Sequence, residues 1–490
     1  MRSASLSGAR VVLLAGPTGL AFFNGGFFDE ARAWAGLGVW LLVLAGLALR
    51  SGAVPRGRNA LIALGGLGLL AAWTLLSLTW APLAGNAYHA GQIVVLYLGT
   101  ALAAVVLFSG ASPLALIDPL LAAGALVVTG YGVSERLAPG VLHFARSVSA
   151  QGRLEQPLSY WNAMGELAAI GLVLCARLAG DGGRSPRLRA SATAASALLG
   201  MGLYVSFSRG ALFACAAGLI TVVTASGRRE QLRATLLCVA VAAGAAAASA
   251  PFGGVTSLAG SLSTRETQGA VVFVLLVVVA LIGASAQLLL IRRERPGRLK
   301  LPRRAPQIAL VAVAAGLALA IAVGSKESSA APRPLPGGAT RLETLQSNRY
   351  AYWKVALRAF GQQPLHGVGA GGWSVYWLRW RTVNEFAQDA HSLPLQVLAE
   401  LGVVGLALLA VFLAGVARAA AQARRLTALA IGPSAGFVAY IAHAPLDWDW
   451  QMPAVTMTAM IMAGALLAIG EAPRPGPAGA LAKPLESGAA

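Results

Sequence analysis

Long apolar runs recur along the whole chain, separated by short segments that carry Gly, Pro and charged residues. Each run holds about 17 to 23 residues, which as α-helix is enough to cross a hydrocarbon core of about 30 Å. Backbone polar groups inside lipid need internal partners, so these runs must be helical. The pattern predicts an all-α polytopic membrane protein with about fourteen spans, at approximately 9–28, 33–49, 60–80, 90–108, 113–133, 158–178, 190–207, 210–226, 234–250, 269–291, 307–324, 395–417, 426–443 and 453–470.

The longest polar interruption is a loop at 325–394. It opens with a Pro-rich linker at 331–338 and continues with two helical patterns on either side of the Gly-rich turn 367–372. Apolar side chains recur there at helical spacing, which predicts two amphipathic helices, over about 341–360 and 373–381. Their apolar faces are predicted to be Tyr350, Trp353, Leu357 and Phe360 on the first helix, and Trp373, Tyr376, Trp377 and Trp380 on the second.

These aromatic side chains have two interpretations. They pack the loop onto the bundle, or some of them stack on sugar rings. The second helix also carries Arg379 and Arg381 beside its aromatic stripe, which is typical of a helix lying in the membrane interface.

From the positions of the spans and of the long loop, the chain divides into an N-terminal bundle (1–324), an extracytoplasmic loop (325–394), C-terminal helices (395–470) and a disordered tail (471–490) rich in Pro, Gly and Ala.

Composition agrees with a membrane protein, because 57% of residues are hydrophobic and only 12% are charged, against about a quarter charged in soluble domains. The net charge of +19 raises the question of nucleic acid. With the N-terminus inside, however, 24 Lys and Arg fall on the inner side and six in the short outer segments, the other eight lying in the long loop. Long loops are left out of the positive-inside rule. We therefore predict cytoplasmic termini, an outer loop and no nucleic-acid partner.

The three cysteines, Cys175, Cys215 and Cys238, all lie in predicted spans and lack C-x-x-C spacing. They are interpreted as small buried apolar residues, so neither a disulfide nor a metal site is expected from them. The first apolar run has no small-residue cleavage site, and it is interpreted as a retained helix.

Three basic side chains are candidates for chemistry, because polar groups are costly near the bilayer. Arg209 lies between the seventh and eighth spans, where its planar fork could bind a phosphate or simply reach the headgroups. Arg349 lies on the first loop helix, where a solvated surface charge is the alternative. His391 precedes the twelfth span and could accept a proton from a hydroxyl, or merely cap the helix.

Two acidic pairs are candidate metal ligands. Asp447 and Asp449 form a D-x-D pattern, but two carboxylates alone make a weak cation site and would point opposite ways in an extended loop. Asp29 and Glu30 have Arg32 close by, which favours local charge balance. We therefore expect no metal.

Five short motifs, in consistent order over about residues 150–450, resemble the O-antigen ligase and O-antigen polymerase family of bacterial membrane proteins. They are Gln156 to Ala163, which opens a mid-chain span, Ser208-Arg209-Gly210, the R-x-x-x-W helix from Arg349 to Trp353, the P-x-x-G-x-G-x-G turn from Pro364 to Gly371, and Ala390-His391-Ser392 followed by L-x-E-L-G-x-x-G at 398–405.

The resemblance implies a C-type glycosyltransferase architecture in the bacterial cytoplasmic membrane. The donor would be an undecaprenyl-diphosphate-linked glycan and the acceptor a hydroxyl outside that membrane, with no cofactor. By motif, Arg209, Arg349 and His391 correspond to the family's two arginines and histidine, while Ser392 replaces a frequent Asn. We count as candidate substrate-binding residues Asn162, Trp353, Trp373, Trp377 and Asp389. Because ligases, polymerases and protein oligosaccharyltransferases share these motifs, a lipid, glycan or protein acceptor stays open.

The implied chemistry fits the residue types. Fixed arginines suit the charge that develops on a leaving diphosphate, and His391 is the nearest plausible base or orienting group for the acceptor. No carboxylate is placed as a nucleophile, which favours a single inverting displacement. The alternative is a transporter or flippase of lipid-linked glycans, for which repeat symmetry is expected but not found. If the protein is such an enzyme, Arg209, Arg349 and His391 must lie together beside one crevice at the outer surface of the bilayer.

Overall fold

Each predicted span coincides with a helix in the computed structural model of the chain, which describes residues 2–49, 54–109, 112–295, 297–300, 302, 304–329, 340, 342 and 347–470. The long helices are α1 (Arg2–Ala21), α2 (Asp29–Leu49), α3 (Arg58–Leu76), α4 (Ala84–Phe108), α5 (Ile117–Leu137), α6 (Trp161–Ala179), α7 (Pro186–Val205), α8 (Arg209–Ser226), α9 (Arg229–Ser249), α11 (Leu262–Arg292), α12 (Ala305–Ser329), α15 (Leu393–Leu426), α16 (Ile431–His443) and α17 (Pro453–Gly470). Shorter elements are α10 (Gly253–Thr256), α13 (Arg349–Gln362), α14 (Trp373–Trp380) and the 3-10 turns η1 (Asn24–Gly26), η2 (Ser77–Thr79), η3 (Ser112–Leu116), η4 (Val148–Ala150), η6 (Ala428–Ala430) and η7 (Asp449–Gln451). No β-strand occurs among these described residues.

The helices have a surface suited to lipid. Within the described ranges, nine helices are long and apolar enough to cross a membrane, and two shorter helices are also apolar. Helices at the edge of the bundle expose large apolar side chains, such as Trp34 on α2 (67%) and Ile282 on α11 (63%). Such contiguous apolar surface is unfavourable in water. The prediction of a polytopic helical membrane protein is confirmed, and fourteen crossings stay a prediction.

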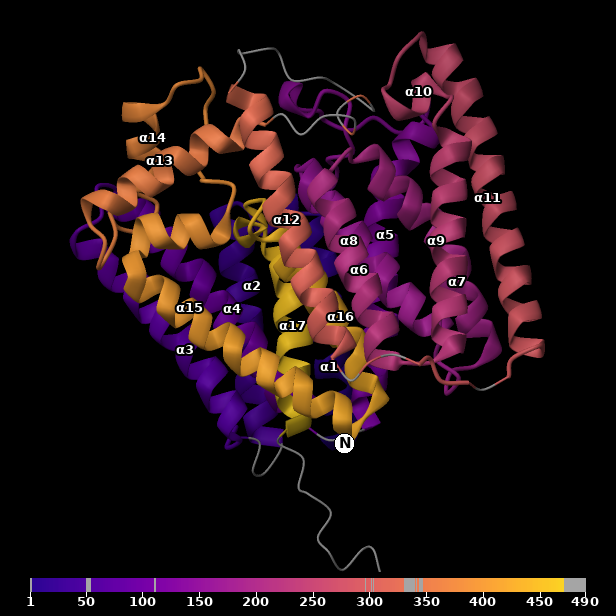
Figure 1. Cartoon of the computed structure of the whole chain (residues 1–490), viewed down its shortest axis with the longest axis horizontal. Coiled ribbons are helices and arrows are strands. Elements are labelled where there is room, and N and C mark those ends of the chain that lie inside the picture. The colour runs from indigo at the N-terminus through magenta and orange to yellow at the C-terminus, as the bar shows by residue number, and fades with distance from the viewer. Residues whose placement is uncertain are drawn as a thin grey trace, which may run out of the picture.

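The centre of the bundle contains α6 and α17, and α6 has an entirely buried 18-residue stretch (Figure 1). Small residues let the surrounding helices approach closely, as is common in membrane bundles. A Cβ added to Gly200 of α7 would lie 2.4 Å from the Cα of Ala242 on α9. A Cβ on Gly66 of α3 would lie 2.8 Å from the backbone N of Phe412 on α15. Larger side chains at these glycines would push the helices apart.

The helices α13 and α14 lie together at the end of the bundle opposite the N-terminus (Figure 1). The first loop helix begins at Arg349, later than predicted, and the linker 331–338 and tail 471–490 lie outside the described residues. The apolar face predicted for this first loop helix, α13, is wrong, because Leu357 is 51% exposed. The buried face is instead Tyr352, Val355, Ala356 and Ala359. Two small alanines on this face allow α13 to pack closely, which a stripe of large aromatic residues does not.

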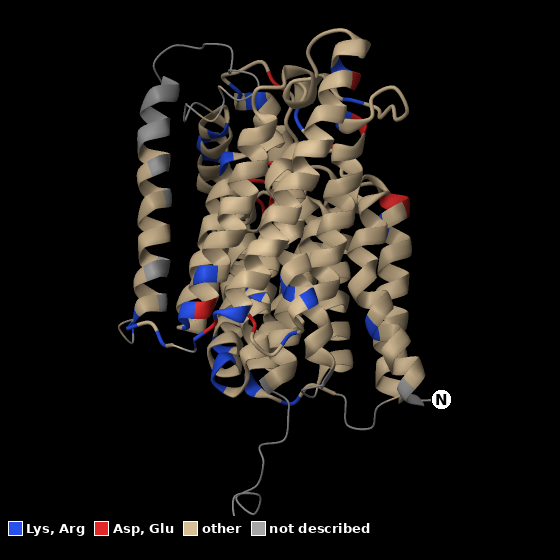
Figure 2. Ribbon diagram, turned by 90° about the vertical axis from the view of Figure 1, so that its right-hand side faces the viewer, with Lys and Arg blue, Asp and Glu red and all other residues tan. Residues whose placement is uncertain are grey.

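The sidedness of the bundle is open to a direct test. Lys and Arg lie toward the two ends of the bundle in Figure 2, and the sequence predicts that the end carrying the N-terminus is cytoplasmic. A topology reporter fused after Gly227 should therefore report the cytoplasmic side. A reporter fused at Ala331, which is not among the described residues, should report the extracytoplasmic side. Enzymatic or alkylation reporters at both positions measure this, and reversal of either would move the loop helices to the cytoplasmic side.

Candidate active site

The loop end of the bundle holds a buried carboxylate, Asp447, that collects three donors. It lies between α16 and α17 and has no exposed surface. Its Oδ2 forms an ion pair with the guanidinium of Arg349, the first residue of α13. Its Oδ1 accepts from the Tyr160 hydroxyl at 2.6 Å and from the Trp448 backbone N–H at 2.9 Å. Burial alone would raise the pKa of Asp447, but Arg349, followed by the two nearby histidines, holds it below the ordinary value.

Tyr160 connects this carboxylate to α6. Its ring packs against Trp448, with centroids 4.5 Å apart, and its hydroxyl accepts from Asn162 Nδ2 at 2.7 Å. Burial and the neighbouring Asp447 raise the pKa of Tyr160, so the hydroxyl stays protonated and donates. Asn162 is only 6% exposed. The structure therefore places the predicted substrate-binding amide behind Tyr160, where it orients the hydroxyl.

His391 lies beside the same turn. Its Nδ1 is 3.0 Å from the carbonyl oxygen of Asp389, and since a carbonyl can only accept, Nδ1 carries the proton and Nε2 keeps its lone pair. The imidazole centroid is 6.1 Å from that of Trp448 and 5.0 Å from that of Tyr352. Burial lowers the pKa of His391 in spite of the Asp447 charge. The imidazole is thus neutral at pH 7 and can accept a proton.

The backbone around His391 is fixed from several sides. Its φ of +51° lies in the left-handed region, which His tolerates better than most side chains. Its carbonyl is 3.4 Å from Trp353 Nε1, so the predicted candidate Trp353 contacts the histidine segment directly. Asp389 accepts from Gln396 at 2.8 Å and from Gln451 at 3.2 Å, and burial raises its pKa. Asp389 therefore ties the histidine segment to α15 and η7.

Arg209 is the first residue of α8, whose N-cap Ser208 accepts from the Ala211 N–H at 3.2 Å. A Cβ on the next residue, Gly210, would lie 2.8 Å from Nε2 of His443 and close to Leu446 as well. The start of α8 therefore lies against the turn that carries Asp447. Arg349 and His391 meet around Asp447 and Trp448, and Arg209 begins a helix that touches the same turn.

The sequence motifs did not single out His443, which is the partner of a buried carboxylate. This side chain ends α16, is fully buried, pairs with Asp449 through Nδ1 and lies 4.0 Å from Glu166. The one sequence feature that could have indicated this pair is the presence of charged residues between apolar spans, because a buried charge needs a partner. The D-x-D pattern suggests a cation site, whereas in the structure Asp447 pairs with Arg349 and Asp449 with His443.

The glycine-rich turn docks on a break in α15. Gly402 has φ +66° and ψ −165°, and the adjoining backbone exchanges hydrogen bonds with the turn, from Gly369 N–H to Glu400 O (2.8 Å) and from Val403 N–H to Pro364 O (2.9 Å). A Cβ on Gly402 would lie 2.2 Å from a turn carbonyl, and one on Gly367 2.2 Å from the Glu400 backbone. Only glycine fits either position. This docking fixes the glycine-rich turn against the break in α15.

Trp373 and Trp377 have no exposed surface. They stack on each other at 5.6 Å and pack edge-on against Tyr352, and Trp377 donates to the Glu385 carbonyl at 3.0 Å. Of the two interpretations of these tryptophans, packing within the loop agrees with the structure, because neither indole face is open to a sugar. The placement of α14 along the membrane surface stays a prediction.

Metal chelation should leave activity intact. No cluster of three or more His, Cys, Asp or Glu suited to a metal occurs in the part of the chain that the structure describes. Asp29 is ion-paired with Arg32, and Asp447 and Asp449 are engaged by Arg349 and His443. For the glycan transfer that the sequence motifs predict, we expect the full rate in excess EDTA, measured as product per unit time. Loss of activity that Mg²⁺ or Mn²⁺ restores would contradict this prediction and would indicate a metal site at one of the two acidic pairs.

Fold and site together define a polytopic helical membrane protein with a polar site at one end of its bundle, where Arg349 and a neutral histidine flank a buried carboxylate. Residues 252–410 match the family model described as O-Antigen ligase, so this part of the chain is similar to the family that its motifs resemble. No curated protein matched the chain. The matched region contains Arg349, His391 and the docked turn, while Arg209, Asn162 and Asp447 lie outside it.

Proposed function

We propose that the protein is a membrane glycosyltransferase that moves a glycan from an undecaprenyl-diphosphate carrier to an acceptor hydroxyl. The similarity of residues 252–410 to the O-antigen ligase family model supports a glycan-processing role in a bacterial membrane, in the manner of O-antigen ligases and polymerases. In the proposed topology both termini are cytoplasmic, and the site faces the outer side of the cytoplasmic membrane. The acceptor is another glycan, a lipid or a protein.

One observation carries the proposal: Arg349 is paired with Asp447, and the charges of both residues act on the pKa of His391. The Arg349 side chain keeps 20% of its surface exposed, so donors remain for a diphosphate. As the acceptor oxygen bonds to the sugar C1, the C1–O bond to the diphosphate breaks and its electron pair stays on the phosphate. The acceptor proton passes to Nε2 of His391. Arg349 and Arg209 stabilise the charge that develops on the leaving group.

The proposal predicts inversion at the anomeric carbon, because the displacement occurs once and no enzyme nucleophile takes part. The test is reconstitution of the purified protein in liposomes with a defined undecaprenyl-diphosphate-linked glycan and three acceptors: a lipid core, a free glycan and a hydroxyl-containing peptide. Mass spectrometry identifies the product and NMR its anomeric configuration. Carrier crossing the bilayer without any transfer would support a transporter instead.

A further inference from the structure

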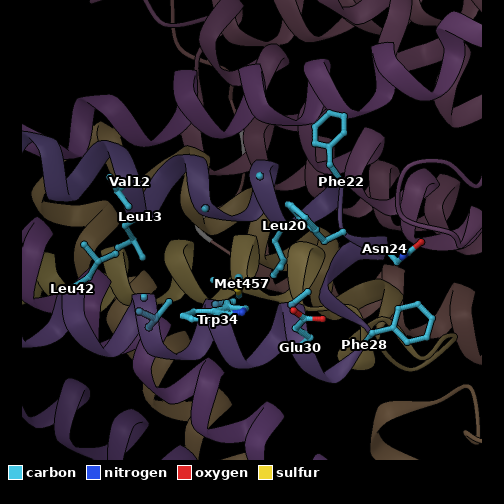
Figure 3. A pocket seen from close by; sticks show the side chains of 17 residues that line it. Val12, Leu13, Leu20, Phe22, Asn24, Phe28, Glu30, Trp34, Leu42 and Met457 are labelled. Carbon is cyan, nitrogen blue, oxygen red and sulfur yellow. The ribbon is translucent and has the colours of Figure 1, made fainter.

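A pocket of about 730 Å³ lies between the start of α3 and the end of α15, at the end of the bundle opposite the candidate active site (Figure 1). Three arginines line it, Arg58, Arg418 and Arg425, and no acidic side chain of the described residues joins them. We call it the basic pocket. The apolar groove on α1 and α2, of about 640 Å³, differs from it, because Glu30 is the one charged residue among the described residues that line the groove (Figure 3).

The sequence of α15 explains how two of these arginines reach one pocket. Arg418, Ala421, Gln422 and Arg425 are spaced i, i+3, i+4 and i+7, so they share one face of the helix, and all four line the pocket. They lie beyond residue 417, in the part of α15 that continues past the predicted end of the span. Ala421 is small and leaves space between the two cations.

The opposite wall is the start of α3, and it is tied firmly to α15. Asn59 Nδ2 donates to Gln422 Oε1 at 2.9 Å, although the two residues are 363 positions apart in the sequence. Further along the same pair of helices, a Cβ added to Gly415 would lie 2.7 Å from the backbone N of Ala63. Arg58 directly precedes Asn59. The two walls are therefore held in place before any ligand binds.

The three arginines are exposed, and none of them forms an ion pair with a carboxylate in the part of the chain that the structure describes. Like charges gathered in one pocket repel each other, and a bound anion offsets that repulsion. The positive-inside rule accounts for basic residues on this side of the membrane. It does not account for their convergence on one pocket from segments so distant in sequence. Because the planar fork of arginine matches phosphate oxygens, a phosphate is the anion that this pocket suits best.

We propose that the basic pocket binds the headgroup of an anionic phospholipid, with phosphatidylglycerol as the probe that tests it. Two apolar side chains, Leu426 and Leu467, also line the pocket, and Leu426 is 62% exposed. Arginines beside exposed apolar surface favour a phosphate that carries acyl chains over a free anion, and basic pockets between membrane helices bind such headgroups. The lipid would join α3 to α15. This site lies far from the candidate active site and does not rest on the glycosyltransferase function.

Native mass spectrometry of the full-length protein in detergent measures this binding, by titration with phosphatidylglycerol and with phosphatidylethanolamine of the same acyl chains. We expect the triple variant Arg58→Gln/Arg418→Gln/Arg425→Gln to bind phosphatidylglycerol roughly a hundredfold more weakly than wild type. Each basic side chain near an anionic lipid contributes about fivefold to affinity, and three are removed. Phosphatidylethanolamine, which has no net charge, should bind weakly to both proteins.

The matched control removes the same charge from exposed arginines on the same predicted side but outside the pocket, in Arg187→Gln/Arg233→Gln/Arg292→Gln. This control should bind phosphatidylglycerol as wild type does. Equal weakening in both triple variants would overturn the proposal, as would equal binding of the two lipids by wild type. Displacement of phosphatidylglycerol by an equal concentration of inorganic phosphate would also contradict it, because the pocket would then be a site for a free anion.

A second measurement needs no variant of the pocket and therefore does not depend on how well the triple variant folds. Phosphatidylglycerol with a photoactivatable group beside its phosphate is incorporated into liposomes with the wild-type protein, and the labelled peptides are identified by mass spectrometry. We expect labelling at the start of α3 and the end of α15, reduced by excess unlabelled phosphatidylglycerol and unaffected by excess phosphatidylethanolamine. Labelling spread evenly over the basic segments at this end of the bundle would contradict a specific site.

Discussion

Arg349→Ala is expected to lower kcat/KM for the lipid-linked donor roughly 30- to 1,000-fold, corresponding to about 2–4 kcal/mol of transition-state stabilisation. The guanidinium is held by Asp447 in a fixed orientation, so it stabilises the departing diphosphate without reorganising. Arg209→Ala should have an effect of the same order, because α8 begins against the same turn. Lysine should rescue either position only partly, since it lacks the planar fork. Initial rates over a range of donor concentrations measure the effect.

The control for Arg349 must separate chemistry from folding. Arg349→Ala leaves a fully buried Asp447 without its cation, and breaking such a pair can cost about 3–5 kcal/mol of stability. In Arg349→Ala/Asp447→Asn the buried charge is gone, while the amide oxygen still accepts from Tyr160. We expect this double variant to regain thermal stability in detergent but not activity. If it transferred glycan at the wild-type rate, the proposed role of Arg349 would be wrong.

Much of the fold was predictable, because apolar run length and the need to pair backbone groups in lipid fix where helices form. The errors concern features that hydropathy does not determine, namely where a helix ends and which of its faces is buried. The basic residues Arg418, Arg424 and Arg425 suggested that a span ended at 417, yet α15 continues to Leu426, since a helix extends into the interface as readily as it ends there. The face of α13 was mispredicted because aromatic residues mark one stripe and small residues the other, and closeness of packing favours the small one.

The candidate site was only half predictable. Short motifs pointed to Arg349 and His391, but not to Asp447, which lies 98 residues beyond its arginine and outside those motifs. Local sequence shows a D-x-D pair between two spans and cannot show which cations reach it. The same limit applies to Tyr160, whose hydroxyl binds a carboxylate 287 residues away. The catalytic roles of Arg209, Arg349 and His391 stay predictions until variants are measured.

His391→Asn should reduce kcat by about 100- to 10,000-fold, the usual contribution of a positioned general base, with little change in KM for the donor. His391 lies at φ +51°, and Asn is among the side chains that best tolerate this conformation. Asn therefore removes the base while keeping the backbone, whereas His391→Ala adds backbone strain to the loss. Both should lower turnover more than donor binding. An Asn variant with full turnover would exclude His391 as base and as orienting group.

The pH dependence separates these two roles of His391. Burial lowers its pKa, Asp447 opposes this and Arg349 adds to it, so the net pKa lies below the ordinary histidine value of about 6.5. A base works in its neutral form, so kcat should be constant above that pH and fall as pH drops through the lowered pKa. If His391 is the base, this acid limb should disappear in His391→Asn while the residual rate stays independent of pH. If His391 only orients the acceptor, the limb should remain in the variant, carried by another group such as Asp389, whose pKa burial raises.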